Sequence, residues 1–128
     1  MRKLVVLLTL VLSASGILLV LLRQLAPEAE WVKWFSLLHT WGGNFYLVLF
    51  PLYAWDHIST NRAWLRVPAL VTASGMVQTL AAALLMATGV LLLLYGSGVW
   101  PSVRLTHHWL TYVLGGALLL HTLSRKHR

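Results

Sequence analysis

Four long apolar segments follow one another along the chain, and none of them contains Lys, Arg, Asp or Glu. They cover residues 4–22, 34–55, 71–94 and 105–123. Each is long enough for a helix that crosses the hydrocarbon core of a bilayer, which takes about 20 residues. We therefore predict an all-α integral membrane protein, folded as one four-helix bundle domain over residues 1–128.

The prolines mark where these helices are interrupted. Pro27, Pro68 and Pro101 fall in or beside the three connections, where the missing backbone N–H costs nothing. Pro51 lies inside the second segment, and we expect it to kink that helix. The first segment continues to Leu22, further than the apolar core of a secretory signal, so we expect a retained helix.

The composition of the chain limits the cross-links and cofactors that it can hold. The chain has 128 residues, 59% of them hydrophobic and 10% charged, and it contains no cysteine. The absence of cysteine excludes disulfides, thiolate-bound clusters and haem attached through Cys-x-x-Cys-His. In a membrane protein, the net charge of +7 is a topological signal rather than a sign of nucleic-acid binding.

Positive charges predict the orientation of the helices. Seven cationic residues lie on the side shared by both termini and the middle loop, and three lie on the other side. Because Lys and Arg are enriched in cytoplasmic loops, we expect cytoplasmic termini and a bacterial inner membrane location. The first group is Arg2, Lys3, Arg62, Arg66, Arg125, Lys126 and Arg128, and the second is Arg23, Lys33 and Arg104.

The two halves of the chain share a pattern. SGILLVLL begins at Ser15 and TGVLLLLY begins at Thr88, and each is followed by a helix that opens with a His-x-Trp triplet. These triplets are HTW at 39–41 and HHW at 107–109. Both of these second helices also carry a later histidine, His57 or His121. The pattern predicts a two-helix unit used twice in the same orientation.

The histidines fall at two levels of the predicted bundle. The 18-residue step from His39 to His57 is five helical turns, about 27 Å. The 14-residue step from His107 to His121 returns within about 40° of one face, whereas His108 points about 140° away from His121. We therefore pair His39 with His107 at the outer level and His57 with His121 at the inner level, with His108 as the rival to His107.

Paired imidazoles that project from two helices into a bundle can hold a haem iron from both sides. The alternative is that the histidines form hydrogen bonds between helices or line a hydrated polar site. Six glycines allow close helix packing, make room for a flat cofactor, or do both. They are Gly16, Gly42, Gly43, Gly89, Gly115 and Gly116.

The chain resembles the small four-helix membrane dihaem cytochromes b, which include cytochrome b561-like proteins and cytochrome subunits of respiratory dehydrogenases. The resemblance rests on ATGVLLLLYG with THHWLTYVLGGALLLH, and on SGILLVLL with LHTWGGNFYLVLFPLYAWDH. It implies two noncovalent haems b and electron transfer between the membrane faces, often with quinone. His107 and His121 match the ligand spacing of the family and His39 matches by context, whereas His57 lies four residues beyond the matching position, Tyr53.

The expected function is one-electron transfer between quinone or quinol and a redox partner, such as a c-type cytochrome or a dehydrogenase subunit. Because the chain has so little soluble surface, we expect a subunit of a larger complex rather than a self-contained enzyme. Two alternatives stay open: a haem-free membrane anchor or assembly subunit, and a small transporter that uses the histidines for protons or metal ions. Cations are available for the haem propionates on both sides, although topology alone also explains them: Lys33 and Arg104 outside, and Arg62, Arg66 and Arg125 inside.

Overall fold

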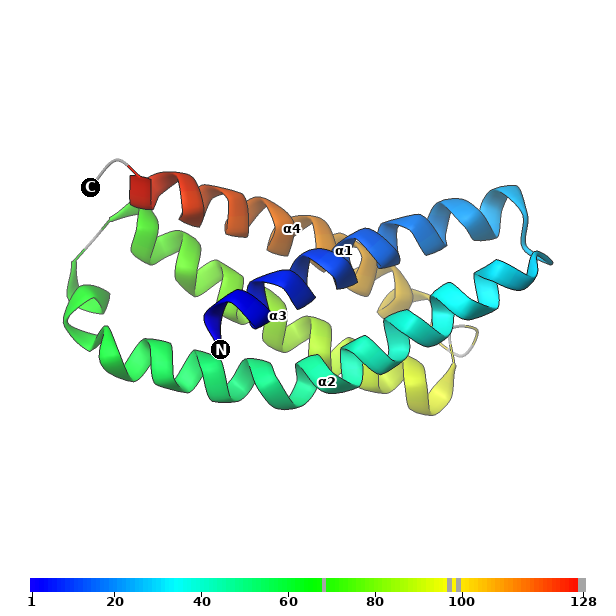
Figure 1. The fold of residues 1–128 in the computed structure, drawn as a ribbon, viewed down its shortest axis with the longest axis horizontal. Helices are drawn as coiled ribbons and strands as arrows, with labels where there is room; N and C mark the ends of the chain where they lie inside the picture. Colours follow the sequence, from blue (N-terminus) through cyan, green and yellow to red (C-terminus); the bar gives the residue numbers. More distant parts are fainter. Residues whose placement is uncertain (68, 97, 99, 127–128) are drawn as a thin grey trace. The chain divides into compact units, whose positions relative to one another are not determined.

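The computed structural model describes residues 1–67, 69–96, 98 and 100–126, and its described residues form helices and no strand. The prediction of an all-α fold is confirmed. Pro68 and Arg128, and the side chains of Arg125 and Lys126, are outside the described part. The elements are α1 (Arg2–Leu25), α2 (Glu30–Thr60), the short 3-10 helix η1 (Arg62–Arg66), α3 (Leu70–Tyr95) and α4 (Pro101–Lys126) (Figure 1).

Each predicted segment lies within one long helix, and every helix extends beyond its apolar segment at both ends. Pro101 is the first residue of α4, a position that needs no backbone N–H. Gly96 ends α3 with φ 76°, a conformation that glycine adopts without steric cost. Pro51 lies within the continuous helix α2, and the kink that we expect there stays a prediction.

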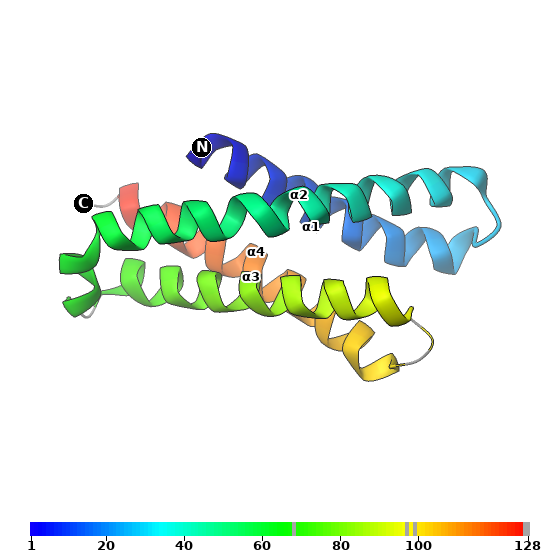
Figure 2. The same ribbon diagram turned by 90° about the horizontal axis from the view of Figure 1, so that it is seen from below.

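The chain divides into two compact units, Met1–Tyr53 and Ala54–Arg128. In the first unit, α1 and most of α2 form an antiparallel hairpin, and in the second unit α3 and α4 form another (Figures 1 and 2). The second unit also contains the last turns of α2 and η1. His39 therefore lies in the first hairpin and His107 and His121 lie in the second, whereas His57 lies in the last turns of α2.

The first hairpin has an apolar contact near its loop and a polar contact further along. Leu19, Leu22 and Val32 form a buried cluster beside the connection. Deeper in the hairpin, Thr9 lies 3.1 Å from the Tyr46 hydroxyl and also bonds the carbonyl of Val5 at 2.8 Å. Both contacts are satisfied only if Thr9 donates to the carbonyl and accepts from Tyr46. This buried bond fixes the register of α1 against α2.

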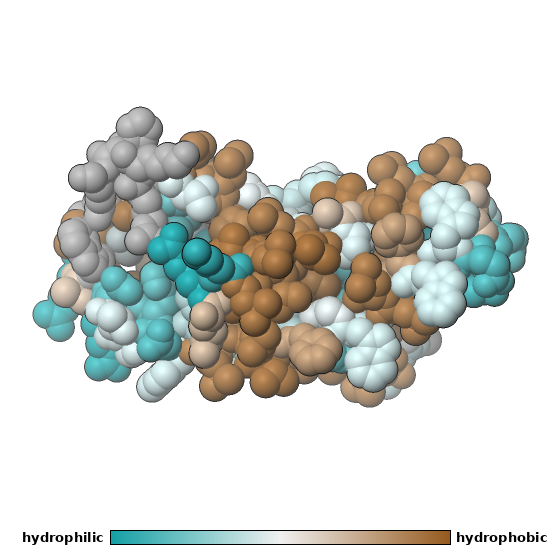
Figure 3. Space-filling model, viewed as in Figure 1, coloured by the Kyte–Doolittle hydropathy of each residue, from teal (hydrophilic) through white to brown (hydrophobic). Residues whose placement is uncertain are grey.

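Much of the helical surface is apolar. Leu7 and Leu10 of α1 are each more than half exposed, and apolar side chains cover the middle of that helix, while hydrophilic ones gather at its loop with α2 (Figure 3). Among the described residues, two helices, α1 and α3, are long and apolar enough to cross a membrane. The conclusion that α1 and α3 could cross a membrane rests on their length and composition.

Candidate functional site

His39 lies on α2 and is held by a hydroxyl of α1. Its Nδ1 is 2.9 Å from Oγ of the buried Ser15, and the same Oγ is 3.1 Å from the carbonyl of Leu12. A carbonyl only accepts hydrogen bonds, so both contacts are satisfied together only if Ser15 donates to Leu12 and accepts from Nδ1–H. In the neutral imidazole of His39, the ring proton is then on Nδ1 and the lone pair is on Nε2.

His107 has the same setting in the other hairpin. Its Nδ1 lies 2.8 Å from Oγ1 of Thr88, which also bonds the carbonyls of Leu84 at 2.8 Å and Leu85 at 3.1 Å. A threonine inside a helix commonly donates to a carbonyl of the preceding turn. Thr88 therefore accepts from Nδ1–H, and the lone pair of the neutral His107 ring is again on Nε2.

His121 reaches the same protonation pattern by a more direct contact. Its Nδ1 is 3.0 Å from the backbone carbonyl of Val71 and 3.5 Å from Oγ of Ser74, at the start of α3. Since the carbonyl cannot donate, Nδ1 carries the proton. Hydrogen bonding of one ring nitrogen in this way fixes the tautomer and orients the ring of a metal-binding histidine.

A glycine follows each of the three hydroxyl residues and lets the ring approach the helix. A Cβ placed at Gly16 would lie 3.1 Å from Cε1 of His39, one at Gly75 would lie 3.3 Å from Cε1 of His121, and one at Gly89 would lie 3.4 Å from Cε1 of His107. Gly16 and Gly89 are therefore packed against imidazoles. The Ser/Thr-Gly dipeptides at 15–16, 74–75 and 88–89 are the signal that would have identified Gly75, Ser15, Ser74 and Thr88 from the sequence.

The repeat extends into the buried positions of α2 and α4. Both helices place key residues at steps of seven, four and three: His39, Tyr46, Phe50 and Tyr53 in α2, and His107, Leu114, Leu118 and His121 in α4. The two middle positions are buried in both helices. Tyr53 thus occupies the place in α2 that His121 occupies in α4.

His57 has different surroundings. The side-chain nitrogen of Asn61 donates to the carbonyl of His57 at 2.7 Å and lies 3.5 Å from Nδ1 of the same residue. An amide nitrogen only donates, so this longer contact favours the tautomer of His57 that carries its ring proton on Nε2. The tautomer at His39, His107 and His121 is the other one.

His107, rather than its neighbour His108, makes the contact with Thr88 and Gly89. Our sequence-based preference for His107 rested on its helical face. The hydrogen bond shows that α3 orients His107, and the choice of His107 over His108 as a ligand stays a prediction. Both histidines are half-buried, so exposure does not distinguish them.

The remaining glycines separate into two kinds. A Cβ at Gly42 would lie 3.0 Å from Cδ2 of Leu12, so Gly42 permits close packing of α1 and α2. A Cβ at Gly43, Gly115 or Gly116 would meet no heavy atom within 4 Å. These three glycines border open space beside the histidine-bearing helices.

The four predicted ligand residues are distributed between the units: His39 lies in the first, and His57, His107 and His121 lie in the second. The outer pair, His39 with His107, would join the two units, and it stays a prediction. Within the described residues, no group of three or more His, Cys, Asp or Glu side chains is arranged to hold a metal ion. A haem iron with two axial histidines needs no such group.

Comparison with known proteins gave no match among family models, curated proteins or solved structures. The resemblance to dihaem cytochromes b therefore rests on the motifs in the sequence.

Proposed function

We propose that this chain is a membrane electron-transfer protein that binds haem b between paired histidines. The observation that carries the proposal is the common setting of His39, His107 and His121. Each bonds an acceptor on the preceding helix through Nδ1–H, and each ring packs against a glycine. Three imidazoles that share one tautomer and that each pack against the glycine of a Ser/Thr-Gly dipeptide favour a shared ligand function.

The residues fit a haem in three respects. The Nδ1 bonds leave Nε2 as the nitrogen with the lone pair, and they increase the basicity of the ring. Gly43, Gly115 and Gly116 leave space beside the helices that carry the histidines. With both axial positions filled by imidazole, bound haem supplies one-electron transfer rather than oxygen or substrate binding.

In this proposal, His39 and His107 hold the outer haem, and His57 and His121 hold the inner one. Ser15 and Thr88 orient the outer ligands, while Val71 and Ser74 orient His121. His57 joins the set only by exchanging its contact with Asn61, because a ligand nitrogen must be deprotonated. The support is therefore stronger for the outer site than for the inner site.

We further propose that all four helices span the membrane with cytoplasmic termini, as the distribution of Lys and Arg predicts. The apolar helices α1 and α3 support this arrangement. The histidines lie on the other two helices, and ionisable residues in membrane helices face the bundle interior rather than lipid. Electrons would pass between quinone or quinol and a redox partner protein in a larger complex.

The test is a reduced-minus-oxidised visible spectrum of the purified protein, with haem quantified as the pyridine haemochrome. We expect low-spin haem b in the native chain, and loss of one haem after His39→Ala or His107→Ala. His108→Ala is the matched control and should retain both haems. A colourless native protein with intact helical content would overturn the proposal and favour a haem-free membrane anchor or assembly subunit. Proton or metal-ion flux into liposomes that contain the haem-free protein would favour a transporter.

A further inference from the structure

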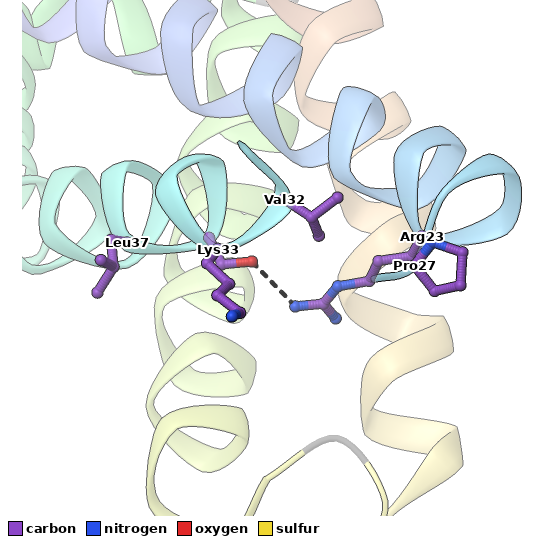
Figure 4. Close-up of a pocket in the computed structure, with 6 residues that line it drawn as sticks. Arg23, Pro27, Val32, Lys33 and Leu37 are labelled. Carbon is purple, nitrogen blue, oxygen red and sulfur yellow. Dashed lines mark hydrogen bonds between the residues drawn. The ribbon is translucent and has the colours of Figure 1, made fainter. Parts of the chain in front are cut away.

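A depression at the loop end of the first hairpin combines cationic and apolar side chains. It is lined by Arg23 of α1, Pro27 of the connection, and Val32, Lys33, Ser36 and Leu37 of α2 (Figure 4). All six residues belong to the first unit. The depression contains no histidine. Among its lining residues, Lys33 is also a candidate cation for a haem propionate, whereas Arg23 has no part in the proposed haem sites.

Arg23 is held at the edge of this depression. It lies in the last turn of α1, where the negative end of the helix dipole favours a cation. Its Nη2 donates to Oγ of Ser36 at 3.2 Å, and in Figure 4 the guanidinium reaches from α1 toward the first turns of α2. A guanidinium has five N–H donors in a planar fork that suits phosphate oxygens. The bond to Ser36 uses one of them and sets the direction of the others.

Lys33 supplies a second cation to the same depression. Its Nζ lies 2.7 Å from a carboxylate oxygen of Glu30, one turn earlier, with both side chains mostly exposed. An exposed pair of this kind contributes little stability. Lys33 can therefore exchange Glu30 for another anion at small cost, and Glu30 acts as a competitor for that anion.

The wall of the depression is apolar. Val32 is buried, whereas Leu37 is exposed and continues the apolar surface along α2. Trp31 and Trp34 lie on the same turns and are also exposed, and tryptophan is enriched at the level of lipid headgroups. An arginine and a lysine beside an apolar side chain, with exposed tryptophans on the same turns of α2, match the two parts of a phospholipid.

The geometry points to a binding site for the phosphate of an anionic phospholipid at this end of the α1–α2 hairpin. Arg23 binds the phosphate oxygens through its fork, Lys33 adds a second charge, and an acyl chain lies along the exposed Leu37. Basic pockets between membrane helices recognise anionic headgroups through this chemistry. The ligand shares its phosphate with free inorganic phosphate, and the apolar wall is what distinguishes the lipid.

The test is native mass spectrometry of the whole protein in detergent micelles containing phosphatidylglycerol or phosphatidylcholine. We expect phosphatidylglycerol to bind and phosphatidylcholine to bind weakly. Arg23→Gln should lower phosphatidylglycerol binding about fivefold, the effect of one basic residue at a membrane surface. Arg2→Gln, the matched control, removes a charge of the same sign from the other end of α1 and should leave binding unchanged. Equal losses in both variants would reduce the effect to overall charge and overturn the site.

Two further variants test whether Glu30 competes with the lipid phosphate for Lys33. Glu30→Gln should raise phosphatidylglycerol binding because it releases Lys33, whereas Glu28→Gln makes the same change of net charge without releasing Lys33. Equal gains from the two variants would contradict the assignment. Inorganic phosphate should not displace the lipid; if it protects the protein against thermal unfolding as well as phosphatidylglycerol does, the site is for a free anion.

Haem content separates this inference from the proposed function. Arg23→Gln should lose lipid binding and keep its full haem content, and the lipid should bind equally well to haem-free protein. If Arg23→Gln loses haem in parallel with lipid, then Arg23 serves a haem propionate and the lipid assignment is wrong.

Discussion

Oγ1 of Thr88 lies 2.8 Å from Nδ1 of His107 and joins α3 to α4 at the opening turns of α4. The hydroxyl also bonds carbonyls of its own helix, so it accepts the ring proton rather than donating to the ring. Ser15 has the same relationship to His39 in the first hairpin. The two outer ligand candidates are thus oriented identically by residues at matching positions of the repeat.

Replacing Thr88 by valine keeps the shape of the side chain and removes the acceptor. We expect haem affinity at the outer site to fall about 10- to 100-fold, the usual effect of losing an outer-shell partner of a metal ligand. The midpoint potential of that haem should rise, because a ring without this bond donates less electron density to the iron. Haem titration of the apoprotein and a redox titration measure both effects.

Thr79→Val is the control for this substitution. Thr79 also lies on α3, and its hydroxyl bonds the carbonyl of Gly75 in the same helix. It should change neither affinity nor potential, and Thr88→Ser should restore both. If Thr88→Val behaves like the native chain in both measurements, the Thr88 hydroxyl does not orient a haem ligand.

Gly115 distinguishes cofactor space from helix packing. Since a Cβ there would meet no heavy atom within 4 Å, Gly115→Leu should leave the fold intact. Leucine is also a better helix former than glycine. We expect helical content by circular dichroism to be unchanged and haem content to fall, because the leucine fills the space that the haem needs.

Ala83→Leu is the control: it adds similar bulk at an exposed position of α3 and should keep the haem. Full haem content in Gly115→Leu would assign this glycine to another role.

The hydroxyl pair of Thr9 and Tyr46 is a stability feature that does not depend on any cofactor. Tyr46→Phe removes the donor to Thr9 and leaves the bond from Thr9 to Val5 in place. A hydrogen bond of this kind contributes about 1 kcal/mol, so we expect a loss of about that size in the free energy of unfolding. Denaturation in detergent measures it. Tyr112→Phe, at an exposed position, should leave the free energy of unfolding unchanged. If it lowers that free energy as much as Tyr46→Phe does, the effect does not come from the bond between Thr9 and Tyr46.

The apolar pattern was enough to predict four helices because it is local: each segment of uncharged residues produced one helix. The repeat was also visible, since Ser15-Gly16 and Thr88-Gly89 precede the two His-x-Trp triplets. The partners of the histidines were not. The bond of His39 to Ser15, or of His121 to Val71, requires the rotation of both helices and the register of their hairpin, and no periodicity within one helix contains that information. Gly75 was missed although the Ser74-Gly75 dipeptide repeats the pattern of Ser15-Gly16 and Thr88-Gly89, and only the contact with His121 shows its role.

The last prediction concerns His57, whose Nδ1 lies 3.5 Å from the donor nitrogen of Asn61, a contact that favours the opposite tautomer. To bind iron through Nε2, the ring must move its proton to Nδ1 and lose this contact. If His57 is the inner ligand, Asn61→Leu should increase occupancy of the inner haem site by removing the donor that opposes ligation.

His57→Ala should leave one haem per chain, and that haem should still be lost when His39 is replaced. Haemochrome quantification of the two variants, with His108→Ala as the control, measures both effects. If His57→Ala keeps two haems, His57 is not a ligand. If the native chain has only one haem and His57→Ala keeps it, the protein is a single-haem cytochrome with His39 and His107 as its ligands.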